Sequence, residues 1–92
     1  MSSPAIRIHA NDNVVIARRQ LLGGTVIAEE GITVAGLVPP GHKIATRAIA
    51  KGQAVRRYDQ IIGSATADIA PGQHVHTHNL EFASFARDYA AG

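Results

Sequence analysis

The sequence predicts one small all-β domain with a short helix after it. Its 92 residues leave little room for a second hydrophobic core. A glycine-centred turn pattern recurs four times, whereas helical periodicity is weak through residue 78. Apolar residues form 46% of the sequence and aromatic residues only 4%, so we expect a core of small aliphatic side chains.

The first segments predict two short strands. Between Ala5 and His9 the apolar side chains of Ile6 and Ile8 alternate with polar ones, as in a half-buried strand. Turn-forming residues separate this segment from the uniformly apolar stretch 14–17. That stretch predicts a short, buried strand.

The recurring pattern is an apolar residue, two further residues, a glycine, two further residues and a second apolar residue. Its four instances are Leu21-Gly24-Ile27, Val38-Gly41-Ile44, Ile49-Gly52-Val55 and Ile69-Gly72-Val75. A proline precedes the glycine in two of them, and this pair is typical of a type II turn in which glycine adopts a positive φ. Each instance therefore predicts a strand end, a tight turn and the start of the next strand.

The C-terminal residues predict a helix that begins near Asn79. Asn79 is a favourable N-cap residue, and Phe82, Phe85, Ala86 and Tyr89 follow at the spacing of one helix face. These side chains would pack either on the domain's own core or on another protein chain.

The composition argues against several classes of protein. The absence of cysteine excludes disulfides, thiolate metal sites and cysteine nucleophiles, and it fits a reducing cytoplasm. The net charge is only +2, and the basic pairs Arg18-Arg19 and Arg56-Arg57 have no aromatic neighbours suited to nucleic acid. We interpret Arg56-Arg57 as a solvated pair on an edge strand. No segment approaches the roughly 20 apolar residues of a membrane span, and no signal peptide is evident. We therefore expect a cytoplasmic protein that binds neither nucleic acid nor membranes.

Three histidines at alternate positions predict a site or the wall of one. In an extended segment His74, His76 and His78 would share one face, about 7 Å apart from one ring to the next. Imidazoles bind metals and act as general bases near neutral pH, so all three are candidate metal ligands and His76 is also a candidate catalytic base. The alternative is a surface strand without chemistry. No carboxylate stands beside the three in sequence, so the group is not expected to form a complete metal site.

The segment after Gly41 is a second candidate. Placed at a turn, His42 and Lys43 would both be exposed, and Lys43 would pair with a substrate carboxylate as a point charge. The alternative for Lys43 is an ordinary solvated lysine. The catalytic candidates are thus His76, His42 and Lys43.

Several stretches together resemble the N-terminal domain of the altronate and galactarate dehydratase family. The matching segments are Ile8-His9-Ala10-Asn11-Asp12-Asn13-Val14, Gly41-His42-Lys43-Ile44-Ala45, residues 59–69 and Gly72-Gln73-His74-Val75-His76-Thr77-His78-Asn79. Such domains belong to the SAF group, whose fold is the β-clip, built from short strands that fold back on themselves. One departure is visible: family members often have Tyr-Gly where this chain has Tyr58-Asp59, which bears on the geometry of that turn.

The resemblance implies a part of a carbon–oxygen lyase that removes water from sugar acids with a divalent metal, iron or manganese. It implies a SAF-type β-clip domain over residues 1–80, and a helix or linker over residues 81–92 toward a large catalytic domain or subunit. This chain alone is expected to be inactive, because it has too few metal ligands and too little surface to enclose a substrate.

Two other functions stay open. Small subunits of sulfolactate sulfo-lyases resemble this chain too, and would expel sulfite in place of hydroxide. A stand-alone SAF module would bind a carbohydrate or protein partner without chemistry. A neighbouring reading frame for a large dehydratase-like chain would favour an enzyme subunit.

Overall fold

The computed structural model describes residues 3–82, which form three small antiparallel sheets. The strands are β1 (Ala5–Ile6), β2 (Val14–Ala17), β3 (Val26–Ile27), β4 (Ile32–Thr33), β5 (Lys43–Ala45), β6 (Ala54–Arg57), β7 (Gln60–Ala65), β8 (His74–Val75) and β9 (Leu80–Phe82). Within this part of the chain the only helical segment is the 3₁₀ turn η1 (Ala28–Glu30). The predicted all-β domain of short strands is confirmed.

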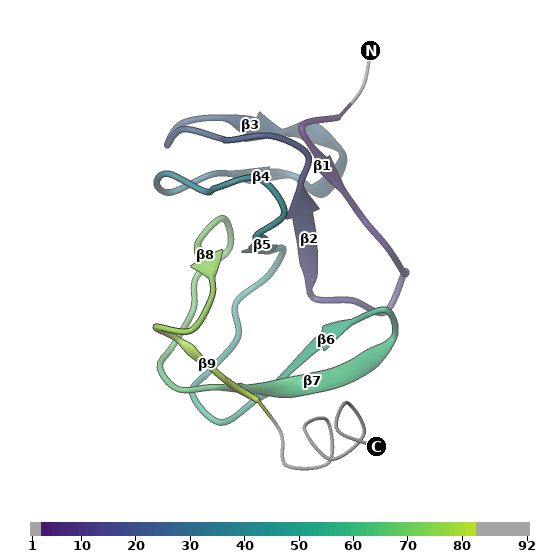
Figure 1. Ribbon diagram of the computed structural model, residues 1–92, viewed down its shortest axis with the longest axis vertical. Coiled ribbons are helices and arrows are strands. Elements are labelled where there is room, and N and C mark those ends of the chain that lie inside the picture. The colour runs from purple at the N-terminus through teal and green to yellow at the C-terminus, as the bar shows by residue number, and fades with distance from the viewer. Residues whose placement is uncertain (1–2, 83–92) are drawn as a thin grey trace.

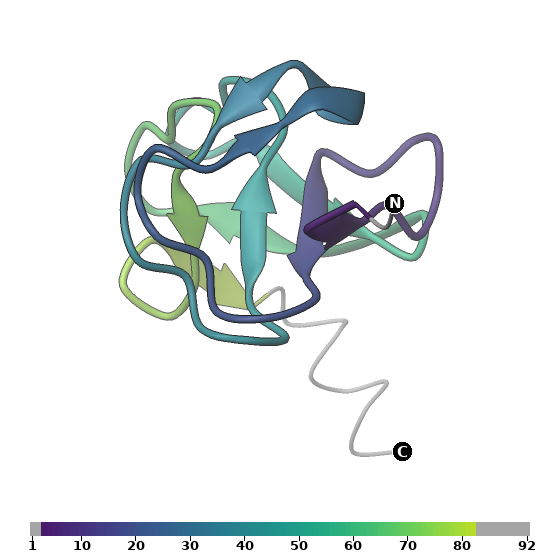
Figure 2. The same ribbon diagram turned by 90° about the horizontal axis from the view of Figure 1, so that it is seen from above.

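The central sheet has four strands in the order β1-β2-β5-β8. The β3–β4 hairpin lies on one side of it and the sheet β6-β7-β9 on the other, as Figure 1 shows from top to bottom. Figure 2, seen from above, shows the four central strands side by side under the β3–β4 hairpin. This layering places β5 and β8 between the two outer sheets.

Each face of the central sheet contributes to a separate hydrophobic core. Successive strand residues point to opposite faces, and accordingly Val15 and Ile44 belong to one buried cluster while Val14 and Ala45 belong to the other. The pairs Val15–Ile44 and Val14–Ala45 face each other across β2 and β5. A strand with a core on both faces is apolar at every position, which explains why residues 14–17 show no alternation.

The four predicted turns are present, and the turn units associate in pairs. Gly24, Gly41, Gly52 and Gly72 all have φ between 80° and 93°. The first residues of units one and two pair in an isolated bridge, Leu21 with Val38, and so do those of units three and four, Ile49 with Ile69. The two pairs of turn units are therefore joined by the same kind of antiparallel backbone bridge.

The prediction that a helix begins near Asn79 is wrong. Leu80–Phe82 is strand β9, which pairs with β7 in the register Ala65–Leu80 and Gly63–Phe82. The Asn79 side chain caps no helix: its Oδ1 accepts from His76 N–H and its Nδ2 donates to the His74 carbonyl. Burial of Leu80 in the second core outweighs the local helix signal. Residues 83–92, with Phe85, Ala86 and Tyr89, lie outside the described residues.

The strand expected from Ala5 to His9 is shorter than predicted, because the Arg7 side chain occupies the backbone acceptors that follow it. β1 ends at Ile6. The Arg7 guanidinium donates to the carbonyls of His9, Ala10 and Asp12 and pairs with Glu30. These contacts fold the segment into a loop, and Ile8 stays 38% exposed.

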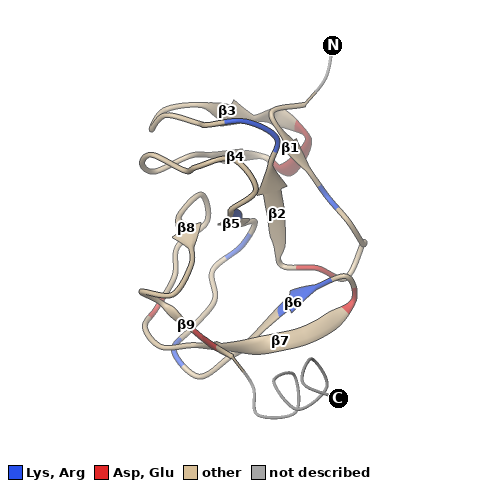
Figure 3. Ribbon diagram, in the orientation of Figure 1, with Lys and Arg blue, Asp and Glu red and all other residues tan. Residues whose placement is uncertain are grey.

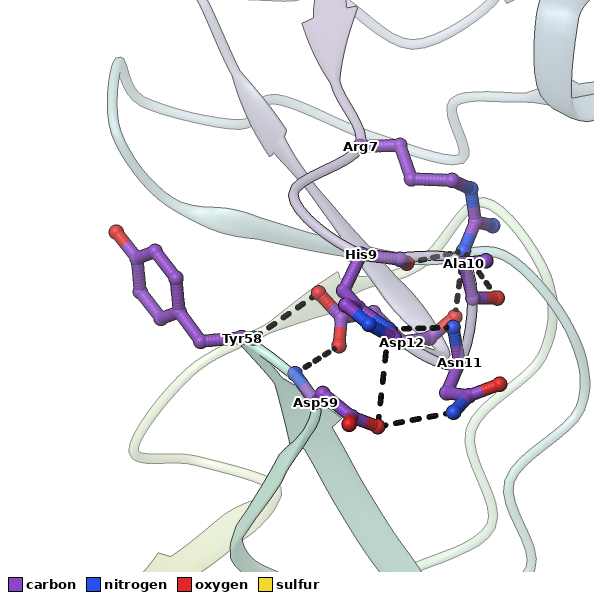
Figure 4. A network of polar contacts seen from close by, with 7 residues as sticks. All are labelled: Arg7, His9, Ala10, Asn11, Asp12, Tyr58 and Asp59. Carbon is purple, nitrogen blue, oxygen red and sulfur yellow. Dashed lines mark hydrogen bonds and ion pairs between the residues drawn. The ribbon is translucent and has the colours of Figure 1, made fainter.

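The turn between β6 and β7 holds Asp59 where members of the family that the sequence resembles often have glycine. Tyr58 and Asp59 both have positive φ, 57° and 58°, a conformation that aspartate adopts more readily than most residues. The buried Asp12 carboxylate accepts from both of their N–H groups, at 3.0 and 2.7 Å (Figure 4). The Asp59 carboxylate accepts from Asn11 Nδ2 and lies 3.6 Å from His9 Nδ1. Residues far apart in sequence thus stabilise this turn.

Candidate histidine site

Three histidines in or beside the neighbouring strands β5 and β8 converge at the edge of the central sheet. His42 directly precedes β5, and His74 lies in β8, whose residues pair with β5. His42 Nδ1 and His74 Nε2 are 2.8 Å apart. The His76 ring lies 4.3 Å from that of His42 and 5.5 Å from that of His74, centroid to centroid. One ring nitrogen from each of the three lies within 4.8 Å of the other two.

A turn, and not a continuous strand, brings the rings of His74 and His76 together. The segment is in strand conformation only at His74 and Val75, and the Asn79 side chain closes the following turn. The two rings are nearly parallel, with an interplanar angle of 9°. The His78 ring lies 5.4 Å from that of His74, whereas the converging nitrogen atoms are those of His42, His74 and His76. The pairing of β5 with β8 brings His42 beside His74, one of the two placements expected for the histidine rings.

Lys43 is buried, which corrects the prediction of an exposed turn residue. It is the first residue of β5, with 9% of its surface accessible, and faces Ile16 on one side and Val75 on the other. Strand β5 begins at Lys43 itself, so Lys43 lies in the sheet and not in the turn before it. The Lys43 side chain forms no hydrogen bond or ion pair within residues 3–82.

Burial and the neighbouring charges favour the neutral imidazoles of His74 and His76. Partial burial lowers the pKa of His74, and the neighbouring His42, His78, His76 and Lys43 lower it further. The pKa of His76 is lowered by desolvation and then by His42 and Lys43. Basic residues lie on β5 and β6 and acidic ones on other segments nearby, such as β9 (Figure 3). A neutral imidazole is the form that accepts a proton or binds a metal.

The donor set fits an imidazole-bound metal such as iron better than manganese. Imidazole suits iron, zinc and copper, whereas manganese favours oxygen ligands. With bonds of about 2.0–2.1 Å, two nitrogens on one metal lie at most about 4.2 Å apart. The 4.8 Å limit that encloses the three nitrogens exceeds this, so small ring rotations would suffice. The converging group contains no carboxylate, so further ligands would have to come from outside it.

We expect the free energy of unfolding to fall as the pH is lowered through about 6.5, the ordinary histidine pKa. The folded pKa values of His74 and His76 lie below it, so the unfolded chain binds more protons between the folded and unfolded values. The contribution is fully present above the unfolded pKa and is lost as the pH falls through the folded one. Urea unfolding at several pH values measures it. His74→Gln should flatten the curve in this window, and an unchanged curve would contradict the assignment.

The chain is similar in sequence to a known family of domains and to several known proteins. The family model described as altronate/galactarate dehydratase SAF domain matches residues 3–83. The chain is 47% identical over 76 residues to altronate dehydratase of Escherichia coli, covering 80% of this chain and 15% of that protein. Against altronate dehydratase of Bacillus subtilis it is 37% identical over 78 residues, covering 83% of this chain and 16% of the relative. The chain therefore spans about one sixth of the length of these two relatives.

A shorter relative has a similar size to this chain. Subunit alpha of (2R)-sulfolactate sulfo-lyase from Chromohalobacter salexigens is 35% identical over 65 residues, which cover 67% of this chain and 69% of that subunit.

Residues 3–82 include no helix that is long and apolar enough to cross a membrane.

Proposed function

The chain belongs to the SAF-domain family of altronate and galactarate dehydratases, and from this premise we propose that it supplies a histidine-lined wall to the active site of a sugar-acid hydro-lyase. The observation that supports the proposal is the convergence of His42, His74 and His76. The rest of the site would come from a large catalytic domain or subunit. The paired turn units support the β-clip architecture that the family implies.

Dehydration of a sugar acid requires a base and stabilisation of negative charge. The base removes the proton α to the carboxylate, the electron pair is held as an enolate-like intermediate, and the β-hydroxyl then leaves with a proton as water. In this proposal His76 is the base, since its imidazole has a lowered pKa and is partly accessible. His42 contacts both His74 and His76 and holds their rings in place. Lys43 adds a positive charge close enough to act on both.

A divalent metal, if bound, would be held by His42 and His74, with His78 beside His74, and His76 of the same converging group would stay free to act as the base. When bound it would supply Lewis-acid stabilisation of the developing negative charge. Because the converging group is made of imidazoles alone, we propose that the partner completes the coordination.

The sulfo-lyase relatives favour a second candidate, in which sulfite and not hydroxide leaves. The matched segment covers 69% of the subunit from Chromohalobacter salexigens, which supports a corresponding role for this domain. A stand-alone SAF module without chemistry is the remaining alternative.

Reconstitution tests the proposal. The tagged 92-residue chain is co-expressed with a large dehydratase-like chain encoded beside it, and the purified complex is assayed with altronate, galactarate and sulfolactate. We expect product only when both chains are present, because neither encloses the substrate alone. Turnover by this chain alone, or equal turnover by the large chain alone, would overturn it. Release of sulfite without dehydration would select the second candidate.

A further inference from the structure

The Asn79 side chain takes the place of a neighbouring strand along the outer edge of β8. Strand β8 is the last in the order β1-β2-β5-β8, and within residues 3–82 it pairs with β5 alone. The Gln73 carbonyl accepts from Ala45 N–H in β5, so alternation turns the His74 carbonyl away from β5. Asn79 Nδ2 donates to that carbonyl and Asn79 Oδ1 accepts from His76 N–H, both at 2.9 Å. A primary amide offers the donor and the acceptor that a strand edge would offer.

Contacts outside the histidine segment fix the position of Asn79. The residue is 8% accessible, and its carbonyl accepts from Thr66 N–H at 3.0 Å. The chain turns directly from β8 into β9 at this point (Figure 1), and the next residue, Leu80, is buried in the second core. The second core and the end of β7 therefore hold the amide in place beside the histidines.

The two rings next to His42 are held by different contacts. His74 lies in β8, where it faces Ile44 of β5, and its Nε2 is 2.8 Å from His42 Nδ1. His76 lies beyond β8, and within residues 3–82 the backbone hydrogen bonds of His76 are both with Asn79. The His76 ring nevertheless stacks on that of His42, with centroids 4.3 Å apart and an interplanar angle of 27°. The placement of this ring therefore depends on Asn79 and not on strand pairing.

We propose that Asn79 is a positioning residue of the histidine site, which holds His76 against His42. The inference rests on the proposed function, because only there does His76 act as the base. Asn79 acts through the backbone of His76 and needs no contact with the substrate. A displacement of about 1 Å at a reacting group can lower a rate about a hundredfold, so the loss of these hydrogen bonds should be visible in turnover.

Asn13 offers a matched control. It is 5% accessible, and its side chain makes the same two kinds of hydrogen bond as that of Asn79. Its Nδ2 donates to the Ala54 carbonyl at 2.9 Å, and its Oδ1 accepts from Arg56 N–H at 2.8 Å. These partners lie in β6, in a different sheet from the histidines. We expect Asn13→Ala and Asn79→Ala to lower the midpoint of urea unfolding by similar amounts, because each removes one donated and one accepted hydrogen bond.

NMR of the 92-residue chain tests the placement of the rings. Nuclear Overhauser effects between the His42 and His76 rings should disappear in Asn79→Ala, while those between His42 and His74 remain. Asn13→Ala should keep both. Asn79→Asp is a second variant of nearly the same size, whose carboxylate keeps the oxygen that accepts from His76 N–H, so it should keep the contact between His42 and His76. Persistence of that contact in Asn79→Ala, or its loss in Asn79→Asp or Asn13→Ala, would overturn the inference.

Turnover of the reconstituted complex separates positioning from a purely structural role. Asn79→Ala should lower kcat about ten- to a hundredfold with little change in KM, since His76 removes a proton and does not hold the substrate. Asn13→Ala should change neither, and equal losses of kcat in the two variants would overturn the inference. Because the ring contacts are measured in the chain by itself, an inactive complex would count against the proposed lyase and not against the positioning of His76.

Discussion

Replacing His76 with alanine should reduce turnover of the reconstituted complex by about two to four orders of magnitude, the usual effect of losing a general base. The His76 side chain is only partly buried, and its backbone N–H, which donates to Asn79, is retained. The free energy of unfolding should therefore change by no more than about 0.5 kcal/mol. Steady-state assays beside urea unfolding of the isolated chain measure the two effects separately.

His78→Ala is the matched control for that experiment. Its ring lies next to His74 but outside the converging group, so its removal should reduce turnover far less. A pH profile adds a second criterion: the acidic limb of kcat/KM should follow a group whose pKa lies below that of an ordinary histidine. Equal losses in the two variants would contradict the assignment of the base to His76.

Gly72→Ala should destabilise the fold far more than Gly41→Ala, although both glycines occupy the same place in the turn pattern. Both have positive φ, 88° and 80°, which costs an alanine about 1–2 kcal/mol. A Cβ at Gly72 would also lie 2.0 Å from the Thr33 carbonyl oxygen, whereas a Cβ at Gly41 would have nothing within 4 Å. Relief of that clash requires backbone movement, and it would strain the hydrogen bond from Ala35 N–H to the Gly72 carbonyl.

We therefore expect Gly41→Ala to lower the free energy of unfolding by about 1–2 kcal/mol and Gly72→Ala by about 4 kcal/mol or more. For a chain of this length the second value approaches the whole stability. Urea or thermal unfolding followed by circular dichroism measures both. Similar losses in the two variants would mean that positive φ alone accounts for these glycines and that the contact with Thr33 is easily relieved.

Local chemistry made the turns, the all-β class and the histidine block predictable. The positive φ of Gly24, Gly41, Gly52 and Gly72 follows from the residues immediately around each glycine. The uniformly apolar stretch 14–17 indicated a buried strand, which is β2. The histidine segment was identified as a candidate site because its members are close in sequence, and the resemblance to the SAF family depends on the same residues.

Contacts between distant residues decided the rest. His42 and His74 are 32 positions apart, and only the pairing of β5 with β8 brings them together. The same pairing buries Lys43, and the core packing of Leu80 replaces the expected start of a helix with β9. The Asp12 carboxylate stabilises the Tyr58–Asp59 turn across 46 and 47 positions. Turn propensity acts over neighbouring residues, whereas burial and strand pairing depend on which segments meet, and only the tertiary structure determines that.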